Sequence, residues 1–178
     1  MKLNTSKEPL GKFFNVNGHK MHFYTEGQGE NTFLLMSGSG TRFPALDFKP
    51  LSSRLSKNNR IAVVDKHGYG WSERVGDSRD IDRIVDEYRE TLKLAGIKPP
   101  YTLVPHSLSG LEALRWAQTY PEEIKGIIGL DPAVPEYYDS AKLPSPKILK
   151  TIAFISRNNL LTPDMVNEAK WVRDNANK

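Results

Sequence analysis

The chain has 178 residues, no cysteine and a formal net charge of +4, and the positive excess lies after residue 140. This length suits one domain with a hydrophobic core, and the missing cysteines exclude disulfides, thiolate metal sites and a cysteine nucleophile. The basic segment carries few interleaved aromatic residues, so we expect no binding to nucleic acid. No apolar run approaches the ~20 residues of a membrane span, so we expect no membrane binding. Because the N-terminus also lacks an apolar signal core, we expect a cytoplasmic protein.

The N-terminal part predicts a hairpin followed by alternating strands and helices. Two strand-like runs, 13–16 and 20–25, flank Asn17-Gly18, a pair of residues typical of a two-residue hairpin turn. Beyond the hairpin, the apolar pattern predicts in order a buried strand at 32–36, a helix at 43–55, a strand at 60–64, a helix at 81–95, a strand at 101–104, a helix at 108–120 and a strand at 126–130. This order predicts an α/β fold, with a mostly parallel sheet, helices on both faces and an antiparallel hairpin at one edge.

The sequence changes character after Asp131-Pro132. Beyond residue 135 no further strand is evident, and short helical stretches alternate with prolines. We therefore divide the chain into a core over 1–134 and a helical cap over 135–178. The apolar residues of the cap either pack it onto the core or line a substrate pocket: Phe154, Leu160, Leu161, Met165, Trp171 and Val172.

Four segments that follow predicted strands are expected to share one edge of the sheet, since the carboxyl ends of parallel strands meet there: 37–41, 65–72, 106–110 and Asp131. One of them holds Ser107 between a strand and a helix, which is the context of a nucleophile elbow. A serine at such a turn attacks a carbonyl only if a base takes its proton and donors receive the oxyanion. The alternative interpretation of Ser107 is a helix N-cap.

Taken in order, the motifs of these loops resemble those of the α/β-hydrolase family. The first loop has serine where the family usually has histidine, and Pro105 and Ser109 replace the two glycines of the elbow. The resemblance runs from about Phe13 to the end of the chain. The matching motifs are Ser37-Gly38-Ser39-Gly40, Asp65-Lys66-His67-Gly68-Tyr69-Gly70-Trp71-Ser72, Pro105-His106-Ser107-Leu108-Ser109-Gly110, Tyr120-Pro121-Glu122-Glu123 and Gly129-Leu130-Asp131-Pro132.

The resemblance implies a hydrolase of ester, amide or thioester bonds in a small-molecule substrate, with Ser107 as the nucleophile and no cofactor. It also implies that the backbone N–H groups of Ser39 and Leu108 receive the oxyanion, although the loop of Ser39 could instead be a flexible turn. Asp131 is either the catalytic acid or a polar cap at a strand end. The remaining motif residues are expected to shape and support the turns: Gly38, Asp65, Gly68, Gly70, Ser72 and Gly110.

The sequence has no counterpart of the family's catalytic histidine. Family members continue past the cap into two strands that carry an acid and a histidine, so we interpret this chain as truncated. The side chain of His106 should diverge from its neighbour Ser107, which leaves His67 at the rim as the candidate substitute base. His19 and His22 are three residues apart on a strand and face opposite sides, so they cannot share a metal ion, and no metal site is expected.

If the sheet ends with the strand at 126–130, this strand lies at the sheet edge although both of its faces are apolar. We therefore expect self-association or a C-terminal partner segment at this edge. Two other functions stay open: a catalytically inactive fragment or binding module that lacks the base, and an acyltransferase or lyase on the same fold. A histidine-bearing coding segment downstream of residue 178 would discriminate the first alternative, and product analysis the second.

Overall fold

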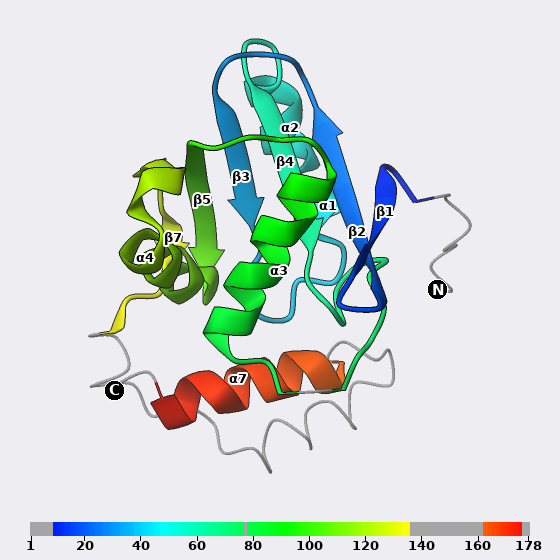
Figure 1. The fold of residues 1–178 in the computed structure, drawn as a ribbon, viewed down its shortest axis with the longest axis vertical. Coiled ribbons are helices and arrows are strands. Elements are labelled where there is room, and N and C mark those ends of the chain that lie inside the picture. The colour runs from blue at the N-terminus through cyan, green and yellow to red at the C-terminus, as the bar shows by residue number, and fades with distance from the viewer. Residues whose placement is uncertain (1–8, 77, 136–161, 176–178) are drawn as a thin grey trace.

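The computed structural model describes residues 9–76, 78–135 and 162–175, and Figure 1 shows a twisted sheet with helices on both sides. The strands follow the order β1-β2-β4-β3-β5-β6, and β7 pairs with β5 beyond this path. The strands are β1 (Lys12–Val16), β2 (His19–Glu26), β3 (Thr32–Met36), β4 (Arg60–Asp65), β5 (Tyr101–Ser107), β6 (Ile124–Ile127) and β7 (Leu130–Pro132). The helices are α1 (Pro44–Asp47), α2 (Lys49–Leu55), α3 (Ile81–Leu94), α4 (Ser109–Thr119), the 3₁₀ turn η1 (Pro121–Glu123) and α7 (Pro163–Asn175).

The pairing of the strands confirms the expected fold class. β1 and β2 form an antiparallel hairpin, and β2 also pairs antiparallel with β4. All other pairs are parallel, namely β3 with β4 and β5, and β5 with β6 and β7. The hairpin turn has φ values of 53° at Asn17 and 87° at Gly18, the positive values that a type I′ turn requires at both of its central residues.

The hydrophobic core lies on both faces of the sheet. Successive residues of the central strands point to opposite sides, as the pleat of a strand dictates. One cluster, beneath α3 and α4, contains Leu34, Val64 and Leu103, and the other, beneath α1 and α2, contains Leu35, Val63 and Val104. A parallel sheet that is covered on both faces explains why these strands are continuous apolar runs in the sequence.

Two predicted elements are interrupted in the structure. The helix expected at 43–55 consists of α1 and α2, because Pro50 lacks a backbone N–H and occupies the first turn of a new helix after Phe48. The strand expected at 126–130 is divided into β6 and β7. Pro132 lies so close to Gly129 that a β-carbon on this glycine would meet the proline ring at 2.4 Å, which marks a tight turn of the chain between the two strands.

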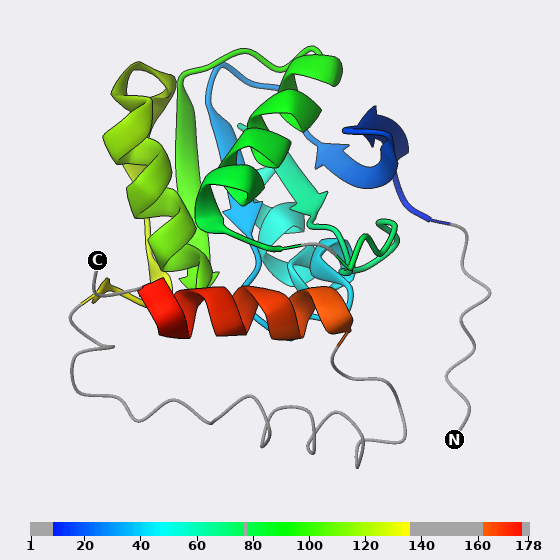
Figure 2. The ribbon, with the colours of Figure 1, turned by 60° about the horizontal axis from the view of Figure 1, so that its bottom comes forward.

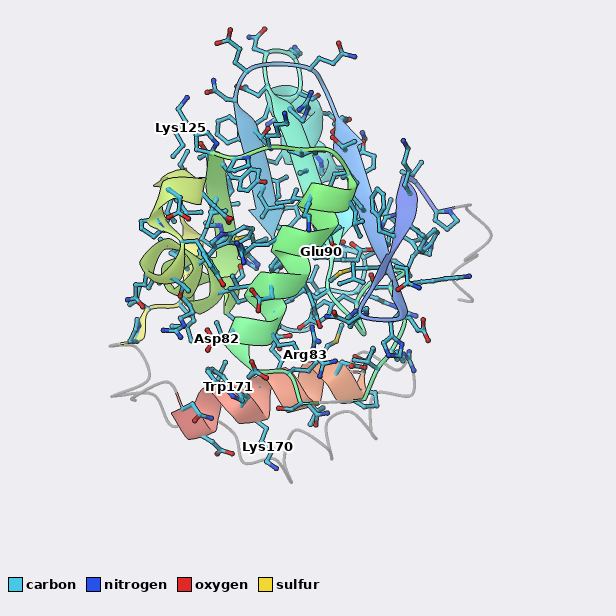
Figure 3. All side chains as sticks on the ribbon, viewed as in Figure 1. Asp82, Arg83, Glu90, Lys125, Lys170 and Trp171 are labelled. Carbon is cyan, nitrogen blue, oxygen red and sulfur yellow. The ribbon has the colours of Figure 1, made fainter. Side chains whose placement is uncertain are left out.

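Helix α7 crosses the carboxyl ends of β3 and β5, and Figures 1 and 2 show this arrangement from two directions. Met165 and Val172 are buried beneath it, and Trp171 packs against the core. Figure 3 shows Trp171 on the side of α7 that faces α3, whereas Lys170 points away from it. The other three apolar cap residues, Phe154, Leu160 and Leu161, lie outside the described residues.

The division of the chain at residue 134 stays a prediction. Within the part of the chain that the structure describes, no helix combines the length and the apolar character that crossing a bilayer requires.

Candidate active site

Ser107 is the last residue of β5, and only Leu108 separates it from the start of α4 at Ser109. Its φ of 53° lies in the left-handed region, which a non-glycine residue adopts at a cost of about 1–3 kcal/mol. The side chain is exposed at the carboxyl edge of the sheet. The turn is held from one side by the amide of Ala133, which donates a hydrogen bond of 2.8 Å to the carbonyl of Ser107.

Two small residues after Ser107 allow this turn to form. The hydroxyl of Ser109 accepts a hydrogen bond from the His106 amide, and it lies 2.9 Å from the carbonyl oxygen of Met36 at the end of β3. Gly110 faces the segment after β7, where a β-carbon would come within 2.2 Å of the Ala133 carbonyl oxygen. A larger residue at position 110 would therefore push α4 away from this segment.

The loop after β3 lies directly against the Ser107 turn. A β-carbon on Gly38 would be 2.8 Å from Cβ of Ser107 and 2.9 Å from the carbonyl oxygen of His106. This contact brings the loop that carries Ser39 next to the turn that carries Leu108. The neighbouring Ser37 is fully buried, and its hydroxyl makes no hydrogen bond within the described part of the chain.

Asp131 lies beside the same turn. It stands in β7 between Leu130, which pairs with His106, and Pro132, which pairs with Ser107. Its φ of 50° is positive, and its side chain is exposed. The structure therefore brings the backbones of Ser107, Gly38 and Asp131 together at one rim.

Asp65 is part of a sealed cluster. Its Oδ2 accepts hydrogen bonds from Nδ1 of His22 at 2.8 Å and from the amide of Trp71 at 3.1 Å. The hydroxyl of Ser72 donates to the Asp65 carbonyl and accepts from the His22 amide. A β-carbon on Gly70 would reach to 1.9 Å from the same Oδ2. These contacts fix the turn at 65–72 to β2.

This cluster contains serine, histidine and aspartate side chains, but its geometry does not support nucleophilic catalysis. Asp65 and His22 are fully buried, and Ser72 contacts the backbone of His22 and not its ring. Sequence reasoning did not find the His22–Asp65 pair, because the two residues are 43 positions apart and no local pattern links them.

The structure places the candidate base His67 in the interior. Its side chain is 1% exposed, its Nδ1 lies 3.2 Å from the Glu73 carbonyl oxygen and its ring packs against His19. Burial lowers the pKa of His67. His106 is exposed, beside Ser107 in the sequence. Among the described residues, no group of three or more His, Asp or Glu side chains has the arrangement of a metal site.

A buried ionic cluster lies between α7 and the sheet, and sequence reasoning missed it. The ammonium of Lys66 donates to Glu112 of α4 and to Glu168 of α7, both at 2.7 Å. The hydroxyl of Tyr69 donates to the second oxygen of Glu168 at 2.8 Å. All four side chains are at most 2% exposed. The sequence held one signal of this cluster: the charged residue Glu112 stands among apolar residues on a predicted helix, which indicates a buried charge that needs a partner.

The pKa values in this cluster follow from burial and charge. Burial is the largest cause that raises the pKa of Glu112, to about 7, and the nearby carboxylate of Glu168 adds to it, while Lys66 opposes the shift. Burial also raises the pKa of Tyr69 well above its usual value, together with the charge of Glu168. The pKa of Lys66 is raised because its two carboxylate partners outweigh the opposing effect of burial.

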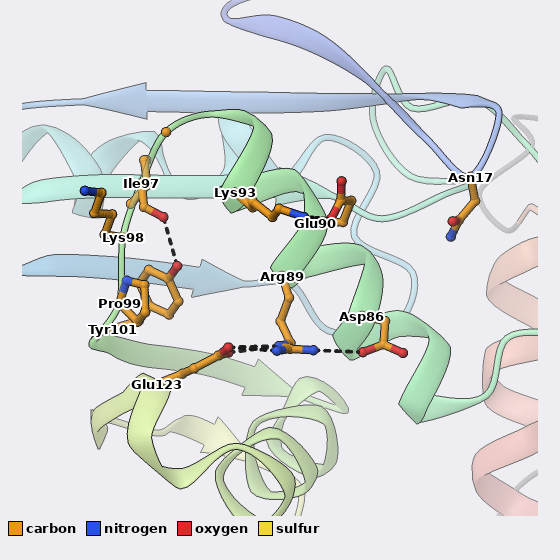
Figure 4. Close-up of a pocket in the computed structure, with 11 residues that line it drawn as sticks. Asn17, Asp86, Arg89, Glu90, Lys93, Ile97, Lys98, Pro99, Tyr101 and Glu123 are labelled. Atoms are coloured by element: carbon orange, nitrogen blue, oxygen red, sulfur yellow. Dashed lines mark hydrogen bonds and ion pairs between the residues drawn. The ribbon is translucent and has the colours of Figure 1, made fainter.

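A cavity of about 610 Å³ lies elsewhere, between the C-terminal half of α3 and the amino end of β5 (Figure 4). Charged side chains line much of it, and the guanidinium of Arg89 pairs with both oxygens of Glu123. None of the residues predicted to form the site lines this cavity. We therefore base the candidate site on the Ser107 rim, where a strained and exposed serine meets the loop of Gly38.

Comparisons with known proteins agree with this fold. The family described as alpha/beta hydrolase fold matches residues 42–159. The protein YbdG of Bacillus subtilis is 50% identical over 144 residues, which cover 81% of this chain and 44% of that protein. A cis-3-alkyl-4-alkyloxetan-2-one decarboxylase of Shewanella oneidensis is 30% identical and is covered to 45%. The chain thus spans less than half the length of these curated relatives.

Solved structures show the same architecture. An esterase from Exiguobacterium antarcticum superposes with a TM-score of 0.71 at 19% identity, over 93% of this chain and 74% of the esterase. A hydrolase from Pseudomonas aeruginosa gives a TM-score of 0.70 at 15% identity, over 92% of this chain and 72% of that hydrolase. At these identities the likeness concerns the fold alone.

Proposed function

The chain belongs to the α/β-hydrolase fold family, and from this premise we propose that it carries the nucleophile of a hydrolase that cleaves an ester, amide or thioester bond in a small molecule. The observation that carries the proposal is the backbone of Ser107, whose positive φ places an exposed serine between β5 and α4. A serine held at such a cost in free energy favours a chemical role over a helix N-cap.

The proposed reaction has two steps. The hydroxyl oxygen of Ser107 attacks the carbonyl carbon of the substrate while a base takes its proton, and the leaving group departs with a proton. Water then attacks the acyl-enzyme and releases the acid, which restores the serine. In both steps the backbone N–H groups of Ser39 and Leu108 would receive the negative oxygen, a role in which one donor contributes about 10²–10³ in rate.

In the described part of the chain, no histidine, His106 included, makes a hydrogen bond with the Ser107 side chain from which it could act as the general base. His22 and His67 are buried in contacts of their own, and His19 lies against Glu73 at 3.3 Å. We place the base in a part of the relatives that this chain does not match. In this proposal the exposed carboxylate of Asp131, one strand away from Ser107, orients the base.

The sheet edge at β6 is where such a segment would join. β6 ends the described sheet, and Ile127, Ile128 and Val134 are 39%, 51% and 41% exposed. A strand that is paired along one edge only and carries exposed apolar side chains favours pairing with another strand along its other edge. We propose that a C-terminal partner segment, or a second copy of the chain, covers this edge.

Labelling with a fluorescent fluorophosphonate tests the proposal. The purified chain is compared alone and after co-expression with the complementing segment, the part of the Bacillus subtilis relative that this chain does not match. We expect labelling with the complementing segment, its loss in Ser107→Ala, and its retention in Ser78→Ala, which removes another exposed serine.

Each other outcome is informative. Labelling of Ser107 in the chain alone would support the nucleophile and contradict a separately supplied base. Absence of labelling in both folded samples would contradict the hydrolase and favour an inactive fragment or binding module. If turnover occurs, analysis of the products distinguishes hydrolysis from acyl transfer or from a lyase reaction.

A further inference from the structure

A continuous path of contacts leads from α7 to the Ser107 turn. It starts at Glu168, which is 2% exposed although it carries a carboxylate. One oxygen of Glu168 accepts from Lys66 at 2.7 Å, and the other accepts from the hydroxyl of Tyr69 at 2.8 Å. Because burial makes an unpaired charge costly, this pairing fixes both the helix and the tyrosine.

Tyr69 connects α7 to the loop after β3. Its side chain is 1% exposed, and its hydroxyl donates to Glu168 of α7 at 2.8 Å. The turn that carries Tyr69 is joined to the loop after β3 by a backbone hydrogen bond, because the amide of Gly70 donates to the carbonyl of Arg42 at 2.9 Å. The loop after β3 is therefore held from the side of α7 as well as by its own strand.

The last step of the path is the contact between Gly38 and Ser107, in which no β-carbon would fit. A displacement of the loop at Ser39 thus changes the distance between this loop and the turn of Ser107. The path connects α7 to the proposed oxyanion donors through the side chains of Glu168 and Tyr69, the backbone hydrogen bond from Gly70 to Arg42 and the close approach of Gly38 to Ser107.

We propose that Glu168 and Tyr69 are positioning residues, which make the docking of α7 set the position of the Ser39 backbone relative to Ser107. The proposal deepens the hydrolase function and rests on it for the role of the Ser39 amide. Neither residue touches the reacting atoms. The cap helix then serves as a part of the catalytic assembly and not merely as a cover.

The N-terminus of α7 is anchored separately. Oδ1 of Asp164 accepts from the amides of Val75 and Gly76 at 3.3 and 3.0 Å, and its β-carbon packs against Gly68. These contacts do not involve Tyr69 or the Ser39 loop. Removal of the Tyr69 hydroxyl should therefore leave α7 in place, while the turn of Tyr69 and Gly70, which holds the loop through Arg42, loses its contact with Glu168.

The experiment uses Tyr69→Phe, which removes only this hydroxyl and leaves the Lys66–Glu168 pair intact. The matched control is Tyr101→Phe, because Tyr101 is also buried and its hydroxyl donates to the Ile97 carbonyl near the amino end of β5. Hydrogen–deuterium exchange of residues 37–42 is measured in the full 178-residue chain. We expect exchange in this loop to be about fivefold faster in Tyr69→Phe and unchanged in Tyr101→Phe.

A second readout is the rate of fluorophosphonate labelling in the presence of the complementing segment. We expect Tyr69→Phe to lower the maximal rate constant about tenfold with the apparent affinity for the probe unchanged, because a misplaced donor affects the transition state. Glu168→Gln should change both readouts in the same direction.

The outcomes separate the inference from the proposed function. Equal exchange of residues 37–42 in the wild type and in Tyr69→Phe would overturn the inference, whatever the labelling shows. Faster exchange in Tyr69→Phe, with no labelling of the wild type, would support the coupling of α7 to the loop and contradict the proposed nucleophile.

Discussion

Gly38 and Ser107 approach each other so closely that a β-carbon on Gly38 would lie 2.8 Å from Cβ of Ser107. The two residues come from the ends of neighbouring parallel strands, β3 and β5. This contact makes the glycine a requirement of the tertiary structure and gives the first prediction.

Gly38→Ala should displace the loop of Ser39 and lower fluorophosphonate labelling of Ser107 about 10–100-fold, because oxyanion donors act only at the correct distance. The control is Gly126→Ala in β6, where a β-carbon would meet nothing within 4 Å. Labelling is measured in both variants with the complementing segment. Equal rates in Gly38→Ala and the wild type would contradict the proposed role of this loop.

Gly70→Ala should unfold or strongly destabilise the chain, by about 3 kcal/mol or more, since its β-carbon would overlap the carboxylate of the buried Asp65. Gly76→Ala is the matched control, because Gly76 also has a positive φ but open space around it. It should cost about 1 kcal/mol from backbone strain alone. Urea denaturation gives both values, and a similar loss in the two variants would show that the carboxylate contact is unimportant.

The stability of the fold should fall between pH 5 and pH 8 because of Glu112. Its pKa is raised by burial from about 4.5 in the unfolded chain to about 7 in the folded one. The folded state therefore holds the proton more tightly, and this stabilisation is lost as the pH rises through 7. For this residue the change is about 3 kcal/mol.

Urea unfolding of the wild type and of Glu112→Gln at several pH values measures this effect. The variant has no proton to lose at this position. The free energy of unfolding of the wild type minus that of the variant should therefore fall by about 3 kcal/mol as the pH rises from 5 to 8. A pH-independent difference between them would contradict the raised pKa of Glu112.

Ile128→Lys should weaken association at the β6 edge, because it places a charge on an exposed apolar strand end, a common means of blocking edge pairing. The control is Leu94→Lys, a change at another exposed apolar residue, which lies at the end of α3. Light scattering of the chain, alone and with the complementing segment, reports the mass. A monodisperse monomer of the wild type under both conditions would contradict the proposed edge contact.

The sequence by itself determined the local parts of this protein. The Asn17-Gly18 turn, the period of α3 and the strand–serine–helix order at Ser107 each depend on contiguous residues whose backbone preferences are visible without the fold. The interruption of the helix at Phe48 could also be predicted from the sequence, because Pro50 favours the first turn of a new helix. These features agree with the structure because they need no partner from elsewhere in the chain.

Only the tertiary structure decided which distant side chains meet. His22 pairs with Asp65 across 43 positions and Lys66 with Glu168 across 102, and α7 comes to lie over the carboxyl ends of the strands. The division of the strand at 126–130 likewise depends on the packing of Pro132 against Gly129. The physical reason is that a buried charge finds its partner only after the hydrophobic core has placed separate elements against each other.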